Sequence, residues 1–261
     1  MSQNDQLRIQ YMGNTPSSNV PIMSLIIIST IINILLYKIL PSSLSPFLKS
    51  HIVSTIHAFI SVVSVVNFFF KYEINFKQIN RILGGGISGT GDEIMVYSVC
   101  YSTGYLIYDL FLMFIYKSVR NNSAIIHHIV ILISILLGLY SKVGHSCHFY
   151  YLAEELSTIP LNLKTIYRNQ PRLHHIFSLL FVASFFLSRL FYGSIIFFYA
   201  FRAAPQFLKM AWNFHDIPSF LIALIQAILC ILTRLLNIYW ALLILKKIFS
   251  KNLSEKKKKS S

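Results

Sequence analysis

Long apolar stretches alternate with short polar segments along most of the chain. Each stretch is close to the roughly 20 residues that an α-helix needs to cross the hydrocarbon core of a bilayer. The pattern predicts an all-α membrane protein with seven transmembrane helices, at about Ile22–Leu40, His51–Phe70, Glu93–Tyr116, Ser123–Tyr140, Cys147–Leu163, His175–Ala200 and Pro218–Ile244.

The fifth of these stretches is the least apolar. It is short and contains Glu154, Glu155 and Pro160. Charged side chains are tolerated within a membrane where neighbouring helices shield them from lipid. We therefore predict that this stretch also spans the membrane, inside a bundle of more apolar helices.

The two ends of the chain are more polar than its middle. The first 20 residues predict a flexible tail, and they lack the basic segment and cleavage site of a signal peptide, so the first apolar stretch is expected to remain as an anchor. The expected organisation is a tail at 1–20, a peripheral first helix with its loop at 21–50, a helical bundle at 51–247 and a basic cytosolic tail at 248–261.

Composition supports a membrane protein and excludes several other classes. Only 12% of the residues are charged and 55% are hydrophobic, whereas soluble domains carry about 25% charged residues. Three cysteines without a Cys-x-x-Cys spacing predict neither a disulfide scaffold nor a zinc site. The net charge of +14 comes from residues that flank the apolar stretches. The expected partners are therefore membrane lipids and not nucleic acid.

The distribution of Lys and Arg between the predicted helices indicates an orientation. Alternate loops hold 14 of these residues on the side that includes the C-terminal tail and 7 on the other side. Cytoplasmic loops carry the excess of positive charge. We therefore expect a cytosolic C-terminus and, with seven helices, an N-terminus on the opposite side, although half of the 14 residues lie in the tail itself.

Polar residues inside the predicted helices are energetically unfavourable, because inserting a charge near the bilayer centre costs at least ~2.5 kcal/mol on insertion scales. Six consecutive helices carry such residues, whereas the first helix shows no comparable stripe before Lys38. This predicts six helices around a polar-lined cavity, with the first helix peripheral. The residues expected to line the cavity are Ser54, His57, Tyr105, Asp109, His127, His128, Glu155, Thr158, Asn162, Arg189, Arg234 and Asn237.

The acidic and basic residues of this set have two interpretations. In the structural one, Asp109 or Glu155 pairs with Arg189 or Arg234 and the pairs only compensate buried charge. In the chemical one, the carboxylates orient a neighbouring base. The sequence leaves both interpretations open.

Histidines favour the chemical interpretation. Adjacent His127 and His128, with His57 on another helix, suit proton transfer or acyl transfer. Neighbouring positions on a helix diverge by about 100°, so the pair cannot chelate one ion from the same helix. We therefore predict no metal site.

Taken in order along the chain, these motifs resemble a known family. They are Ser54, His57 and Ala58; Gly104, Tyr105 and Asp109; His127 and His128; Glu155, Ser157 and Thr158; and Arg189. Over about residues 51–247 the chain resembles the TLC domain (the TRAM, Lag and CLN type), and it is most similar to short TLC-domain proteins of the transmembrane-protein-56 type. The resemblance implies a multi-pass protein of the endoplasmic reticulum that binds or senses a lipid or acyl chain in lipid homeostasis.

The same resemblance implies an alternative function. Ceramide synthases share the domain, and their paired histidines match His127 and His128. A lipid N-acyltransferase of this type would use one histidine as general base or acyl acceptor, Asp109 or Glu155 to orient it, and acyl-CoA as donor. The aspartates that follow in ceramide synthases are absent here, since residues 145–155 contain glutamates but no aspartate. Without this reaction no cofactor is expected.

The last residues, Lys258-Lys259-Ser260-Ser261, resemble the dilysine retrieval signal of endoplasmic-reticulum membrane proteins. Such a signal acts only on the cytosolic side, which agrees with the orientation expected from loop charge.

Overall fold

The computed structural model describes residues 21–71, 92–141 and 143–259, and all regular elements in this part of the chain are helical. The N-terminal tail predicted for residues 1–20 lies outside the described residues. In chain order the elements are α2 (Ile22–Ile39), α3 (Pro46–Lys71), α5 (Asp92–Ile115), α6 (Asn122–Ser141), α7 (His145–Tyr151), the 3₁₀-helix η1 (Leu152–Ser157), α8 (Thr158–Ile166), α9 (Pro171–Phe185), the π-helix η2 (Phe186–Tyr192), α10 (Gly193–Asn213) and α11 (Ile217–Lys259).

Six helices in the described part of the chain are long and apolar enough to cross a membrane. They are Ile22–Ile39, Pro46–Lys71, Glu93–Ile115, Asn122–Ser141, the continuous run Pro171–Asn213 and Ile217–Ile248. They correspond to six of the seven predicted helices. The prediction of seven membrane-length helices is not confirmed, because the fifth stretch forms three short pieces.

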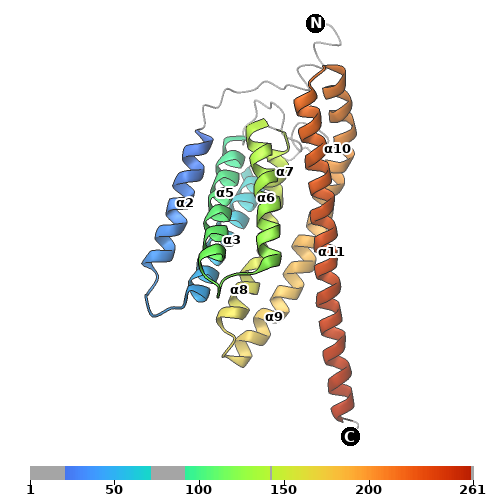
Figure 1. The fold of residues 1–261 in the computed structure, drawn as a ribbon. Helices are drawn as coiled ribbons and strands as arrows, with labels where there is room; N and C mark the ends of the chain where they lie inside the picture. Colours follow the sequence, from blue (N-terminus) through green and yellow to red (C-terminus); the bar gives the residue numbers. More distant parts are fainter. Residues whose placement is uncertain (1–20, 72–91, 142, 260–261) are drawn as a thin grey trace.

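This fifth stretch consists of α7, η1 and α8, which follow one another without a loop. Pro160 lies in the first turn of α8, a position at which a helix tolerates proline. In Figure 1 the three pieces run from the end of the bundle where α6 stops to the end where α9 begins. The stretch thus passes through the bundle although no single helix in it has membrane length.

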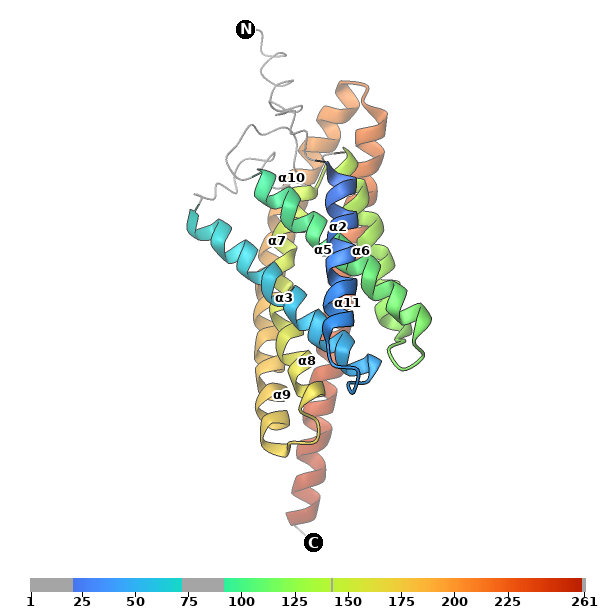
Figure 2. The ribbon, with the colours of Figure 1, turned by 90° about the vertical axis from the view of Figure 1, so that its left-hand side faces the viewer.

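Helix α2 packs along α5 at the edge of the bundle (Figure 2). Ser29 Oγ donates a hydrogen bond to the carbonyl of Tyr101 at 2.7 Å, and Thr30 Oγ1 donates to the carbonyl of Gly104 at 3.2 Å. A Cβ at Gly104 would lie 2.5 Å from Ser29 Oγ, so this glycine allows the close approach. The expectation that the first helix carries no polar stripe was wrong, because Asn33 is also buried on this face.

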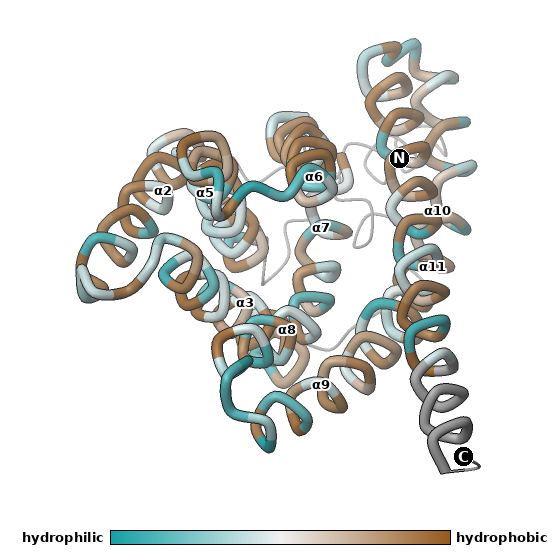
Figure 3. The backbone as a smooth tube through the Cα atoms, turned by 60° about the horizontal axis from the view of Figure 1, so that its bottom comes forward, coloured by the Kyte–Doolittle hydropathy of each residue, from teal (hydrophilic) through white to brown (hydrophobic). Residues whose placement is uncertain are grey.

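The outer faces of the helices are apolar. Large hydrophobic side chains are exposed along α2 and α11, among them Ile28, Leu235 and Leu242, each at least half exposed. Figure 3 shows the polar residues gathered at the turns, for example between α5 and α6 and between α8 and α9. An apolar exterior with polar ends is what a bilayer requires of a helical protein.

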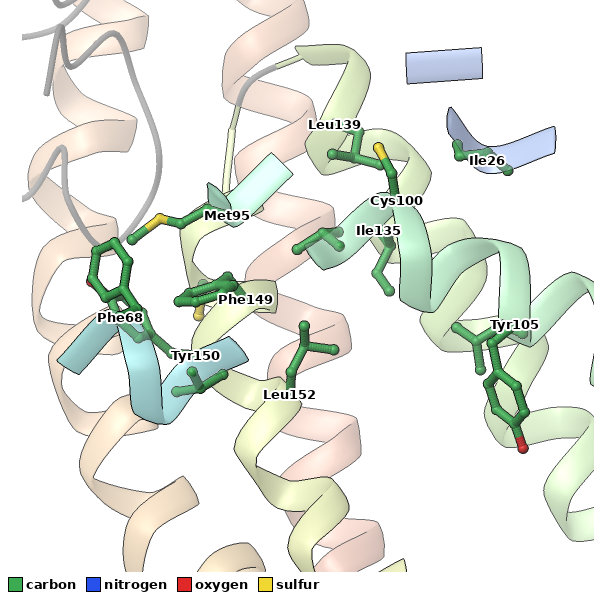
Figure 4. Packing of buried hydrophobic residues seen from close by; sticks show 14 of the residues in the cluster. Ile26, Phe68, Met95, Cys100, Tyr105, Ile135, Leu139, Phe149, Tyr150 and Leu152 are labelled. Carbon is green, nitrogen blue, oxygen red and sulfur yellow. The ribbon is translucent and has the colours of Figure 1, made fainter. Parts of the chain in front are cut away.

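The main apolar core joins α3, α5, α6 and α7 (Figure 4). Phe149 of α7 is fully buried and meets Phe68 of α3 edge to face, with ring centroids 5.2 Å apart. Cys100 of α5 and Ile135 of α6 belong to the same buried cluster. The short helix α7 is therefore held in the bundle by close packing and not by its own length.

Candidate functional site

A cavity of about 1490 Å³ lies among α3, α5, α6, the α7–α8 stretch, α9 to α10 and α11. The structure places every residue of the predicted set in its lining: Ser54, His57, Tyr105, Asp109, His127, His128, Glu155, Thr158, Asn162, Arg189, Arg234 and Asn237. The helical spacing of these residues is the reason that they share one interior surface. Their partners differ in part from those expected.

His128 and Asp109 form the contact that most resembles a catalytic pair. His128 Nδ1 lies 3.3 Å from Asp109 Oδ2, although the angle is not that of a hydrogen bond. The other carboxylate oxygen, Oδ1, accepts a hydrogen bond from Ser50 Oγ at 3.3 Å. Asp109 is thereby held between α3 and α6, close to one nitrogen of the histidine ring.

His127 has different surroundings, as expected for an adjacent helical position. Its ring meets Trp240 of α11 edge to face at 5.4 Å between centroids, and it lies 5.8 Å from the ring of His128. Only His128 of the two is close to a carboxylate among the described residues. The two histidines therefore differ in what they can do.

His57 is fixed in the wall of the cavity. Its Nε2 is within hydrogen-bond distance of Ser102 Oγ at 3.1 Å and of Ser61 Oγ at 3.2 Å. The ring stacks on Tyr105, with centroids 3.8 Å apart and planes within 9°. These contacts orient the ring and leave it little freedom to move.

Arg234 pairs with Glu154, and not with Asp109 or Glu155, the two partners that the structural interpretation of the sequence considered. The guanidinium contacts the Glu154 carboxylate directly and also donates to the carbonyl of Arg189 at 3.0 Å. Asn237 Nδ2 donates to the second carboxylate oxygen at 3.2 Å. A Cβ at Gly193 would overlap both members of the pair, so the absence of a side chain there makes room for it.

Arg189 is held more loosely than Arg234. Its Nε donates to Ser157 Oγ at 2.9 Å, while its Nη2 lies 3.8 Å from Glu155 and 3.5 Å from Thr158 Oγ1. It lies on η2, and π-helical turns are frequent at functional sites. The pair of Arg189 with Glu155 is one of the pairings that the sequence left open.

A second polar cluster, not predicted as a site, joins α6, α7 and α11. Gln226 accepts a hydrogen bond from Ser134 Oγ at 2.8 Å and lies 3.1 Å from His148 Nε2. Its amide also donates to the carbonyl of Ser134 at 2.7 Å. Gln226 shares a helix face with Arg234, which was the only sequence signal for it.

Two further residues of the predicted set, Asn162 and Thr158, line the cavity, but their contacts do not indicate a role. Asn162 is buried, and its Nδ2 has no hydrogen-bond partner among the described residues. Thr158 has only the long contact to Arg189. In the part of the chain that the structure describes, no three His, Cys, Asp or Glu side chains are grouped so that they could hold a metal ion.

Six apolar membrane-length helices in the described residues, five of which line the cavity, define the chain as a multi-pass helical membrane protein. The model of the TLC domain family matches residues 48–246. The chain therefore belongs to the TLC domain family. No curated protein and no solved structure shows significant similarity to it.

Proposed function

We propose that the protein binds a membrane lipid by its acyl chain inside the helix bundle and acts in lipid homeostasis. The observation that carries this proposal is the cavity, which combines charged and hydrogen-bonding groups at its centre with an apolar end. A ligand with a polar group and a hydrocarbon chain fits both parts. The family is consistent with a lipid-related function in a membrane.

The apolar end of the cavity lies between α10 and α11. Small and aromatic side chains predominate in its lining, namely Phe197, Ala200, Phe201 and Ala204 of α10 and Ala223 and Ala227 of α11. Gln226 lies between the two alanines, and its amide is already satisfied by contacts with Ser134 and His148. Ala223 precedes Arg234 by eleven residues, which corresponds to about 16 Å of helix. This length is available to an acyl chain that extends away from the charged centre.

A second candidate function is lipid N-acyl transfer, which the contact between His128 and Asp109 favours. A carboxylate beside one ring nitrogen can hold the ring so that the other nitrogen faces the cavity and takes a proton or an acyl group. The donor would be acyl-CoA. The same contact is compatible with binding alone, so mutants must separate the two functions.

Membrane placement is also part of the proposal. The stretch α7–η1–α8 would form a seventh crossing, shielded by its neighbours, and the seven crossings would place the C-terminus in the cytosol. The ending Lys258-Lys259-Ser260-Ser261 supports residence in the endoplasmic reticulum. Both Asn-x-Ser sequences, at Asn121 and Asn252, would then face the cytosol and stay unglycosylated.

This placement predicts the result of protease treatment of sealed microsomes. A tag at the C-terminus should be removed by added protease, and a tag at the N-terminus should be protected, because an odd number of crossings puts the ends on opposite sides. Detergent should expose both tags, which controls for protease activity. Removal of both tags from sealed vesicles would contradict the seventh crossing.

Lipid binding itself is tested by photo-crosslinking. A diacylglycerol with a photoactivatable chain should label residues of α10 and α11 at the apolar end of the cavity in the purified full-length protein. Replacing Ala204 or Ala227 by Trp should fill this space and reduce the labelling. The surface substitution Leu235→Trp, on an exposed side chain of α11, is the matched control. Equal labelling of all three variants and the wild type would overturn the proposal.

A further inference from the structure

The cavity reaches the turn between α5 and α6, at the end of the bundle opposite to its apolar end. Lys117, Arg120 and Asn121 of this turn are part of the lining. Backbone N–H groups of Val119 and Arg120 donate to the carbonyl of Tyr116 at 3.0 and 3.2 Å, which closes the turn. The two basic residues are therefore held three positions apart on an ordered piece of backbone.

The basic side chains of this turn have no acidic partner. Among the described residues that line the cavity, the only carboxylates are Asp109, Glu154 and Glu155. Each of these already lies next to a basic group deeper in the cavity, namely His128, Arg234 and Arg189. Lys117 and Arg120 are exposed and form no ion pair with the described residues.

Charge thus differs between the two polar parts of the cavity. At the centre, the charges of Glu154 and Glu155 are compensated by Arg234 and Arg189, which favours a neutral polar group such as an ester carbonyl. At the turn, two positive charges are uncompensated, and Lys and Arg bind phosphate oxygens through charge-assisted hydrogen bonds. Basic pockets between membrane helices are a known form of lipid headgroup recognition.

We propose that Lys117 and Arg120 bind the phosphate of a glycerophospholipid whose ester lies at the histidines and whose chain fills the apolar end. This rests on the proposed lipid-binding function and names its ligand class. Figure 3 shows the α5–α6 turn as a polar segment at one end of the bundle.

The spacing along α6 supports a glycerolipid in particular. Ser123, at the turn, and His128, at the charged centre, both line the cavity and are five residues apart, which is about 7.5 Å of helix. A glycerol bridge between phosphate and ester spans a short distance of this kind. The pantetheine arm of acyl-CoA is many bonds longer and would carry its phosphates well beyond the turn.

The test compares two photoactivatable lipids with identical chains in the full-length protein in dodecyl maltoside, a detergent without phosphate. Phosphatidic acid should label the cavity at least about tenfold more efficiently than diacylglycerol. The double variant K117Q/R120Q should lose this preference and keep its labelling by diacylglycerol. Inorganic phosphate at the concentration of the lipid should have no effect, because it lacks the chain.

A matched control removes two charges from the same end of the protein without touching the cavity. Arg168 and Arg172 lie in and after the turn between α8 and α9, are exposed and are not part of the lining. The variant R168Q/R172Q should keep the preference for phosphatidic acid. If this control loses the preference to the same extent, surface charge explains it and the site is overturned.

The remaining outcomes separate this site from the proposed function. Equal labelling of wild type and K117Q/R120Q by phosphatidic acid, with both lipids in the cavity, would overturn the phosphate site alone. Loss of phosphatidic acid labelling on addition of an equal concentration of inorganic phosphate would overturn the assignment to a lipid. Labelling of the cavity by neither lipid would overturn lipid binding as a whole.

Discussion

Replacing Glu154 by alanine is expected to destabilise the protein by about 3–5 kcal/mol, because Arg234 would be left as a buried charge without its partner. Both side chains are about nine-tenths buried in the structure. Arg234 would keep its hydrogen bond to the carbonyl of Arg189 and its contact with the face of the Tyr151 ring, neither of which supplies a negative charge. The measurement is unfolding of the purified protein by sodium dodecyl sulphate in mixed micelles.

Two variants show whether the pair itself is responsible. Glu155→Ala removes a neighbouring carboxylate that lies 3.8 Å from Arg189 and is more exposed, so it should have a much smaller effect. The double variant E154L/R234L should recover part of the lost stability, because apolar residues of similar size often replace a buried pair at little cost. An unfolding midpoint of Glu154→Ala equal to that of the wild type would contradict the structural role.

Alanine at His128 and at His127 should have effects of different kinds. If the cavity transfers acyl groups, His128→Ala should lower the rate by about 10²–10⁴-fold with little loss of fold, because its ring lies beside Asp109. His127→Ala should retain activity per folded molecule and lose about 0.5–1.5 kcal/mol of stability, because its ring packs on Trp240.

The measurement is the lipid profile of a strain that lacks the gene and expresses each variant, normalised to the amount of protein in the membrane. Asp109→Asn is the companion variant, since it keeps the size of the side chain and removes the charge next to His128. Full restoration of the profile by both histidine variants would exclude acyl transfer and leave lipid binding as the function.

Hydropathy alone predicted the class of this protein and the positions of six of its helices. In lipid every backbone N–H and C=O group must find a partner within the protein. A single apolar stretch of membrane length can satisfy this requirement by itself only as an α-helix. The same periodicity predicted which residues share an interior surface, and all twelve predicted residues line the cavity. A 3.6-residue repeat determines which side of a helix a residue is on, and that is sufficient for both results.

The polar contacts of α2 could not be predicted from hydropathy. Ser29, Thr30 and Asn33 are few among many apolar residues, and hydropathy averages them away. Their role depends on the neighbouring backbone of α5, which comes close only because position 104 is glycine. No feature of the first helix by itself predicts that neighbour.

The ion pairs at the charged centre could not be predicted from the sequence either. Glu154 and Glu155 are adjacent in sequence, and nothing in the sequence says which of them meets Arg234. Both glutamates lie on the 3₁₀-helix η1. Glu154 contacts Arg234 and Asn237 of α11, whereas Glu155 lies near Arg189 of η2. A helical repeat assigns each residue to a face of its own helix, but the rotation and the distance between helices are properties of the packed bundle. For this reason the sequence could place twelve residues that line the cavity, whereas the ion pairs among them required the tertiary structure.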